Sequence, residues 1–446
     1  MRLMTNDNSS RRRRFLGSVL AVGVGAISGC SSSSTETGTE ATGRETETAE
    51  RGPEATESVS TEADGRESQI DSYVEVDGTQ MVVDGEPVYL FGTRPMHVMT
   101  LNWASDHIEL LFDELDRMGA TLARVHAFQP FWGDPSLQPQ PGDYNEEIMR
   151  RLDRVVEAAQ NRGIRLSLML INGKPPLHNA DTLDENFGVN AHTYANHVET
   201  AEEYDDFYSN EECMKLYKQR VETVLTRENT VTGVEYRNDP TVAMWELGNE
   251  IEYAEPWRRD DPTLQPWIDE MSSYVKSIDS NHLVTTGEFS WADRNNFEAD
   301  HEPDGIDVCS VHYYPGPNSY DLANDPGRAH PDILEDLITT GHQDIEKPVY
   351  VGEYNWQVEQ GADSPLTTRN EQLRVRHDVF DRTDVAAAAF HALGLDSEQD
   401  YPRGGSTAYA DSDEGSMAEF RRFAEQRHNK SASGALPPLP PFESSD

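Results

Sequence analysis

The chain has 446 residues and a formal net charge of −44, because 81 Asp and Glu stand against 37 Lys and Arg. Such a charge repels nucleic acids and anionic lipid surfaces, so it excludes a nucleic-acid partner. The acidic residues are spread along the whole chain, and Lys occurs only six times. This distribution favours a surface adapted to high salt over an acidic tail that binds a partner. The length suits one large α/β barrel domain.

The first thirty residues have the features of an export signal. Residues 10–16 read SRRRRFL, and twin arginines followed by Phe-Leu resemble a Tat signal. The apolar stretch that follows, Leu16 to Gly29, is too short to span a membrane and has the length of a signal-peptide core. It ends in ISGC, which resembles a lipoprotein cleavage box with Cys30 as the lipidated residue. The alternative is an uncleaved N-terminal anchor; both interpretations predict an extracellular folded domain.

Residues 31–68 contain Ser, Thr, Glu and Gly with almost no apolar side chains. Such a segment cannot bury enough surface to offset its chain entropy, and we expect a disordered linker. Residues 431–446 form a second polar, proline-rich end, which predicts a flexible tail. These boundaries leave residues 69–430 for the catalytic domain.

Between these ends, short apolar runs alternate with longer amphipathic stretches, the pattern of βα units around a parallel sheet. A hairpin is expected over residues 73–88, before the first run. Helices are expected over 106–119, 145–163 and 208–229. Eight runs are present, the number that closes a (β/α)8 TIM barrel of the α/β class: 88–93, 121–128, 164–171, 242–250, 283–290, 306–314, 348–355 and 386–393. An open doubly wound sheet is the alternative, but the Gly-rich phosphate loop expected after its first strand is missing.

Active sites of such barrels lie at the carboxyl ends of the strands. The predicted strands end in polar residues that apolar packing does not require: Arg124, His126, Asn249, Glu250, Glu288, His312, Tyr314 and Glu353. Glu250 and Glu353 end the fourth and seventh strands, which lie across the barrel mouth from each other. Glycoside hydrolysis uses two such carboxyl groups, one as acid and one as base or nucleophile.

The sequence around these residues resembles the plant and fungal endo-β-1,4-mannanases of glycoside hydrolase family 5. The most specific part is LTRENTVTGVEYRNDPTVAMWELGNE, which ends at Glu250. The similarity continues through 270–288, then SVHYYP at 310–315 and KPVYVGEY at 347–354. It covers most of residues 75–395 and implies a retaining hydrolase on a TIM barrel.

The resemblance implies a role for each matching residue. Glu250 takes the position of the acid/base and Glu353 that of the nucleophile. Asn249 takes the position of the residue that binds the sugar 2-hydroxyl group beside the reacting carbon.

Three further residues match groups that support the two glutamates. His312 and Tyr314 match the pair that orients them, and the two-residue spacing puts both side chains on one face of a strand. Arg124 matches the arginine that keeps the nucleophile ionised, as a neighbouring cation does.

The chain departs from the mannanase pattern where the cleaved sugar binds. His126 stands where the second strand usually has Trp, and His391 follows Phe390 where the eighth strand usually has Trp. Thr93-Arg94-Pro95 replaces the usual Asn-Ala-Tyr. These changes predict weaker sugar stacking, with Trp356 as a substitute platform. Other tryptophans expected in loops at this end are Trp132, Trp257 and Trp291.

We therefore expect a secreted hydrolase of β-1,4-mannan, acting as a monomer on a polysaccharide and reaching the membrane only through a lipid anchor. Two alternatives stay within enzymes: a hydrolase of another β-glycan and an exo-β-mannosidase. A third is a non-catalytic carbohydrate-binding lipoprotein. No cofactor or metal is expected, since Cys213 and Cys309 lack metal spacing and His192 and His197 lie in a polar loop.

Overall fold

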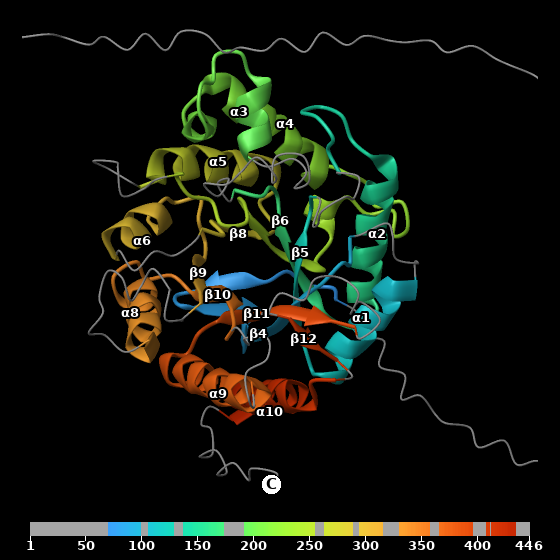
Figure 1. Cartoon of the computed structure of the whole chain (residues 1–446), viewed down its shortest axis with the longest axis vertical. Helices are drawn as coiled ribbons and strands as arrows, with labels where there is room; N and C mark the ends of the chain where they lie inside the picture. Colours follow the sequence, from blue (N-terminus) through green and yellow to red (C-terminus); the bar gives the residue numbers. More distant parts are fainter. Residues whose placement is uncertain are drawn as a thin grey trace, which may run out of the picture. The chain divides into compact units, whose positions relative to one another are not determined.

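Eight parallel strands surround a common axis in the computed structural model of the chain (Figure 1). The structure describes residues 70–99, 106–128, 137–173, 191–254, 263–288, 294–314, 330–356, 365–395, 407–410 and 412–433. The barrel strands are β4 (Leu90–Pro95), β5 (Leu122–His126), β6 (Arg165–Met169), β7 (Val242–Glu246), β8 (Leu283–Thr285), β9 (Cys309–Tyr313), β10 (Val349–Tyr354) and β11 (Ala387–Gly394).

The strands pair in the order β8-β7-β6-β5-β4-β11-β10-β9, so each strand lies beside its neighbour in the chain and β11 returns to β4. The remaining seam, between β8 and β9, is joined by a parallel bridge from Thr285 to Val308. There the Asp307 amide donates a hydrogen bond to the Val284 carbonyl at 2.9 Å. This order confirms the predicted (β/α)8 barrel and rules out the open sheet.

Helices surround the strand ring on its outer side (Figure 1). They are α1 (Asp106–Arg117), α2 (Glu146–Gln160), α3 (Ala191–His197), α4 (Glu211–Leu225), α5 (Gln265–Ile278), α6 (Arg294–His301), α8 (His330–Gln343), α9 (Pro365–Thr383) and α10 (Glu414–Ser433). Two 3-10 turns, Tyr204–Tyr208 and Tyr236–Asn238, precede α4 and β7, and a short strand β12 (Ala408–Tyr409) adds to β11. No helix of the described ranges is long and apolar enough to cross a membrane.

Asparagine caps set the starts of two of the expected helices. The Asn145 side chain accepts hydrogen bonds from the Glu147 and Ile148 amides, so α2 begins at Glu146. Asn210 caps α4 in the same way. The sequence predicted that the third helix begins at residue 208, but Tyr208 ends a 3-10 turn and the cap delays the α-helix to Glu211.

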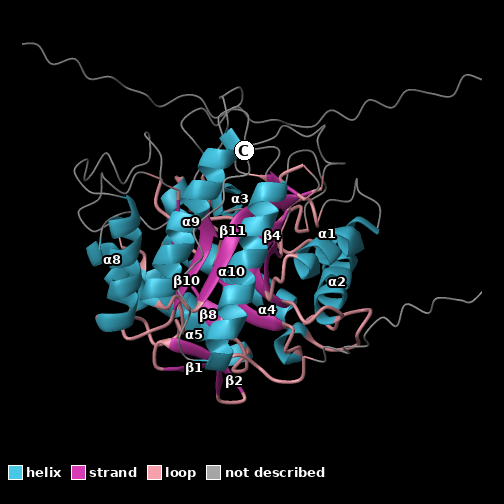
Figure 2. Ribbon diagram, turned by 90° about the horizontal axis from the view of Figure 1, so that it is seen from below, coloured by secondary structure: helices cyan, strands magenta, loops and turns pink. Residues whose placement is uncertain are grey.

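A small antiparallel sheet contributes to the core at the amino ends of the barrel strands (Figure 2). It consists of β1 (Glu75–Asp77), β2 (Gln80–Val83) and β3 (Glu86–Val88). Glycines with positive φ make both turns, Gly78 at 61° and Gly85 at 80°. The expected hairpin is thus a three-stranded meander, because the segment has two such turns. Met81 of this sheet and Val74 just before it pack with strand-start residues such as Leu90 and Leu283. Apolar side chains thus fill this end of the barrel, and the candidate active site lies at the other end.

Several sequence predictions lie outside the described residues: the export signal with Cys30, the linker, and Trp132, Trp257 and Trp291. The catalytic domain was predicted to end at residue 430, whereas α10 continues to Ser433.

Candidate active site

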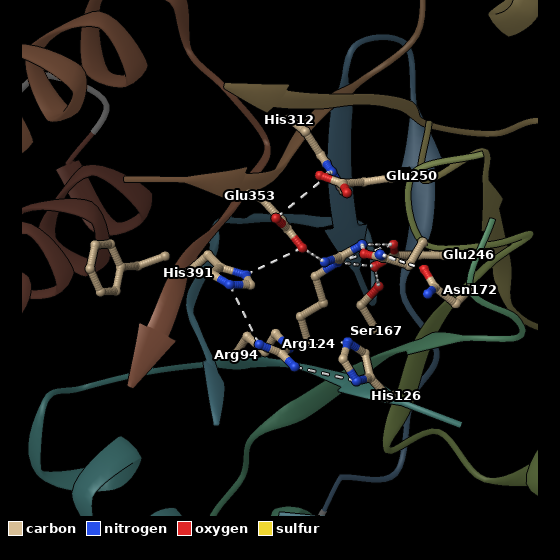
Figure 3. A network of polar contacts seen from close by, with 12 residues as sticks. Arg94, Arg124, His126, Ser167, Asn172, Glu246, Glu250, His312, Glu353 and His391 are labelled. Atoms are coloured by element: carbon tan, nitrogen blue, oxygen red, sulfur yellow. Dashed lines mark hydrogen bonds and ion pairs between the residues drawn. The ribbon is translucent and has the colours of Figure 1, made fainter. Parts of the chain in front are cut away.

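Arg124 and Glu353 meet inside the carboxyl end of the barrel, from β5 and β10 (Figure 3). Both side chains are almost entirely buried, and the Arg124 Nη1 atom donates to the Glu353 carboxylate. The strands bring them together because inward-pointing side chains of parallel strands converge on the barrel axis.

A second carboxylate holds the other edge of the same guanidinium. Glu246, at the end of β7, accepts from Arg124 Nε at 2.9 Å and from Nη2 at 2.7 Å. Ser167 Oγ on β6 also donates to Glu246, at 2.6 Å. Glu246 therefore fixes the plane of the arginine that contacts Glu353.

Glu250 reaches the barrel mouth from the loop after β7, four residues past the end of the strand. Its backbone has φ of 50°, a conformation uncommon outside glycine and often found at functional sites. Its amide donates to the Gly287 carbonyl at 2.7 Å, which ties this turn to the loop after β8. Gly287 also has positive φ, and a Cβ there would lie 2.0 Å from the Gly248 carbonyl oxygen.

Glu250 and Glu353 converge beside His312 of β9. One carboxylate oxygen of each glutamate and one ring nitrogen of His312 all lie within 4.8 Å of one another. The His312 Nδ1 atom is 3.5 Å from Glu250 Oε1 and 4.0 Å from Glu353 Oε2. Among the described residues, these three side chains are also the group of His, Cys, Asp and Glu side chains whose ligand atoms lie close enough together to bind one metal ion. Since Arg124 already places a positive charge against Glu353, we interpret the convergence as catalytic.

Charge and burial give Glu353 and Tyr314 different protonation states. Burial alone raises the pKa of Glu353, but the interactions of its carboxylate with His391, including a hydrogen bond, and with Arg124 and His312 outweigh burial and hold this pKa well below its ordinary value. The Tyr314 hydroxyl donates to Glu353 Oε2, and burial beside the two glutamates raises the pKa of Tyr314 well above 10. Glu353 is thus a carboxylate held by two donors.

The Asn249 side chain is oriented from both ends of its amide. Its Oδ1 atom accepts from Arg124 Nη2 at 3.1 Å, and its Nδ2 atom donates to Asn172 Oδ1 at 3.1 Å. Asn249 remains partly exposed beside the fully buried arginine.

Comparison with known proteins agrees with this geometry. The model of the GH family 5 beta-mannosidase-like group matches residues 71–355. The chain belongs to glycoside hydrolase family 5. It is 34% identical over 365 residues to mannan endo-1,4-beta-mannosidase 3 of Oryza sativa, covering 73% of each chain. It is 37% identical over 273 residues to mannan endo-1,4-beta-mannosidase 4 of the same species, covering 55% of each.

Among solved structures, the endo-1,4-beta-mannanase of Rhizomucor miehei superposes with a TM-score of 0.65 at 25% identity. That match covers 80% of this chain and all of the fungal one. In several plant relatives, however, the matched segment spans only 55 to 59% of the relative's own length.

The two histidines expected to depart from the mannanase pattern, His126 and His391, both lie beside Arg94 of β4. Arg94 Nε donates to His126 Nε2 at 3.0 Å, and Arg94 Nη1 lies 3.5 Å from His391 Nε2. His391 Nδ1 in turn lies 3.3 Å from Glu353 Oε1, and its side chain is 22% exposed. His126 stacks on Phe128, with ring centroids 4.4 Å apart. We call Arg94, His126 and His391 the basic cluster.

Two other predicted residues have different surroundings. The Trp356 ring lies against the Arg376 guanidinium of α9, 5.5 Å from ring centroid to guanidinium carbon, and is partly buried. Glu288 was predicted at a strand end but lies three residues past the end of β8, buried 3.6 Å from His301 of α6. It therefore belongs to a separate polar group behind β8.

Sequence reasoning missed Glu246 and assigned no role to Arg94. For Glu246 a signal existed, because a glutamate follows the apolar residues VAMW in the fourth predicted strand. The neighbouring strand carries the polar residues Arg165 and Ser167. For Arg94 the signal was the replacement of a small residue by a cation at a strand end. Asn172, which orients Asn249, follows an apolar run and has no distinguishing pattern.

Proposed function

We propose that the chain hydrolyses β-1,4-mannosidic linkages in mannan-type polysaccharides with net retention of anomeric configuration. The observation that carries this proposal is the short distance between Glu250 and Glu353, whose nearest oxygens and His312 lie within 4.8 Å. Retaining glycosidases hold their carboxyl groups about 5–5.5 Å apart, whereas inverting enzymes leave about 6.5–9.5 Å for a water molecule.

In the first step of this mechanism the Glu353 carboxylate attacks the anomeric carbon as the bond to the leaving oxygen breaks. Glu250, as a neutral acid, protonates that oxygen, and a glycosyl-enzyme ester forms. In the second step the Glu250 carboxylate takes a proton from water, and the water oxygen displaces Glu353 from the sugar. Arg124 and Tyr314 keep Glu353 ionised and oriented between the steps.

The names of the relatives, mannan endo-1,4-beta-mannosidases, support a mannan-type substrate. His391 of the basic cluster supports a second candidate, hydrolysis of another β-glycan such as glucomannan, because it lies beside Glu353 where the mannanase pattern has Trp. Exo action on β-mannosides stays an alternative of the same chemistry. A binding-only lipoprotein has no need for two converging glutamates with an arginine against one of them.

A product profile on β-mannan, glucomannan and cellulose tests the substrate, with Glu353→Gln as the inactive control. Mannan should be cleaved fastest, to a ladder of oligosaccharides. Release of mannose alone would indicate exo action instead. Proton NMR during cleavage of mannohexaose should show the β-anomer first, and initial α-anomer would contradict retention.

We also propose that the protein is exported through the Tat pathway and lipid-anchored at Cys30. The support is the sequence alone: twin arginines in 10–16, a short apolar core and the ISGC box. Cys30→Ser should move activity from the membrane fraction to the medium. Replacement of the arginines in 10–16 by Lys should leave the protein inside the cell. An unchanged distribution in both variants would contradict the proposal.

A further inference from the structure

The basic cluster contains one group whose hydrogen-bonding role is fixed by its chemistry. A guanidinium group has only donors, so any ring nitrogen that bonds to Arg94 must be the acceptor. For His391 that nitrogen is Nε2, 3.5 Å from Arg94 Nη1. A neutral imidazole that accepts at Nε2 carries its proton on Nδ1.

The Nδ1 atom of His391 faces the predicted nucleophile. It lies 3.3 Å from Glu353 Oε1. This atom is buried and Glu353 lies within hydrogen-bonding distance of it, so a proton on Nδ1 can be donated to the carboxylate. We propose that Arg94 is a positioning residue that holds His391 in its neutral Nδ1–H tautomer, so that His391 donates to Glu353.

The surroundings favour a neutral ring over an imidazolium. Burial lowers the pKa of His391, and the cations Arg94 and Arg124 add to this, while Glu353 opposes them; the net direction is down. Burial also lowers the pKa of Arg94, to about 10, so Arg94 remains a cation at neutral pH. His391 is then a donor that orients the carboxylate without adding a full charge beside it.

Several charged or titratable groups face Glu353 besides His391, and a pH profile reports on all of them. They come from every strand packed against this carboxylate: Arg94 of β4, Arg124 and His126 of β5, Glu250 after β7, His312 and Tyr314 at β9, and Tyr350 of β10 itself. A test must therefore compare variants that differ in the His391 proton but have the same total charge facing Glu353.

The tautomer can be observed directly in the wild-type full-length chain. Long-range proton–nitrogen NMR spectra of ¹⁵N-histidine-labelled protein distinguish Nδ1–H, Nε2–H and charged rings, and loss of one signal set in His391→Asn assigns the residue. We expect the Nδ1–H form throughout the active pH range. An Nε2–H form or an imidazolium would overturn the inference.

Two amide substitutions provide the matched kinetic test. The Asn side-chain nitrogen takes roughly the place of imidazole Nδ1, and the Gln nitrogen that of Nε2. His391→Asn should retain the wild-type pH profile on mannohexaose. His391→Gln should raise the pKa of Glu353, move the acid limb of kcat/KM to higher pH, and lower kcat/KM below the optimum by on the order of tenfold.

Arg94 supplies the second pair. Arg94→Met frees the ring and should reproduce the His391→Gln profile, whereas Arg94→Gln, which loses the same positive charge but keeps an N–H donor, should restore most of the wild-type profile. Equal profiles in all four variants would overturn the inference. A rise in KM with an unmoved acid limb would do so as well, because the Nδ1 proton would then bind sugar.

The kinetic arm rests on the proposed function, but the NMR arm does not. A wild-type protein that leaves mannohexaose intact would refute the proposed hydrolysis and leave the tautomer measurement decisive for Arg94 and His391. An active enzyme with the wrong tautomer would refute only the inference.

Discussion

Arg124 lies between two carboxylates with its side chain fully out of solvent, and Glu246 on one side is equally buried. Burial alone would lower the pKa of Arg124, yet Glu246 and Glu353 raise it well above its ordinary value. Buried ion pairs gain little net stability because desolvation offsets attraction. The Arg124–Glu246 pair instead serves to hold Glu353 in place. Removal of Glu246 would leave part of the desolvation cost of the Arg124 charge without a compensating attraction.

Removing one partner of this pair should therefore be costly. We expect Glu246→Ala to lower the free energy of unfolding by about 3–5 kcal/mol, since it leaves Arg124 with a single carboxylate. The exposed pair Arg382–Glu335, with side chains 45% and 40% exposed, provides the control. Glu335→Ala should cost about 0–1 kcal/mol. Urea unfolding of both variants at one high salt concentration measures the difference, and equal costs would contradict this role for Glu246.

The assignment of the two glutamates can be separated by chemical rescue. Glu353→Ala should lower kcat by about 10⁴-fold or more, because no covalent intermediate can form. Azide can then attack in place of the missing carboxylate and should give the α-mannosyl azide. In Glu250→Ala, azide should instead intercept the glycosyl-enzyme and give the β-azide. Exchanged products, the β-azide from Glu353→Ala and the α-azide from Glu250→Ala, would mean that the two roles are misassigned.

At the scale of the elements, the pattern of apolar runs predicts all eight barrel strands. It places strand ends less well: the fourth run was extended to Glu250, but β7 stops at Glu246. Beyond Glu246 the chain turns, and Glu250 has a positive φ. Because this residue is not a glycine, the local sequence does not predict that conformation. Contacts such as Arg94 with His391 join residues 297 positions apart, so they depend on barrel closure and not on any local motif.

The loop after β8 and helix α6 share a buried acid pair outside the catalytic group. Burial and the neighbouring Asp300 raise the pKa of Glu288 well above its ordinary value, and burial raises that of Asp300 from 3.8 to about 6. His301 beside them is neutral, because burial lowers its pKa to about 3. Thr263, just before α5, donates to Asp300 and links a third element to the pair.

The raised pKa values of Glu288 and Asp300 predict that the free energy of unfolding falls as the pH rises. A carboxyl with a raised pKa binds its proton more tightly in the folded state, so its contribution is complete below about pH 4 and is lost as pH rises through about 6. Asp300→Asn should remove that loss, worth about 2–3 kcal/mol. The difference in melting temperature, variant minus wild type, should grow between pH 4 and 7. A constant difference would place the pKa of Asp300 in its ordinary range.

For the molecule as a whole, ion pairs between neighbouring side chains do not neutralise the excess of acidic residues. Arg162 contacts both Glu109, at 2.7 Å, and Asp113, at 2.6 Å, and so neutralises only one of two carboxylates. Arg227 stands in the same way between Glu146 and Asp153. With 81 acidic and 37 basic residues, such pairs leave the surface strongly negative.

This excess predicts that the folded chain needs salt. Self-repulsion at a net charge of −44 destabilises the compact state, and screening relieves it: the Debye length falls from about 30 Å at 0.01 M to about 3 Å at 1 M. Salt also weakens pairs such as those of Arg162, but each exposed pair is worth only about 0–1 kcal/mol, so relief of repulsion should dominate. We expect the melting temperature to rise by about 5 °C or more between 0.01 M and 1 M NaCl, which corresponds to roughly 2 kcal/mol. Sucrose at matched osmolarity is the control, since it stabilises by exclusion from the surface without screening charge. A rise no larger than that in sucrose would mean that repulsion does not limit the fold.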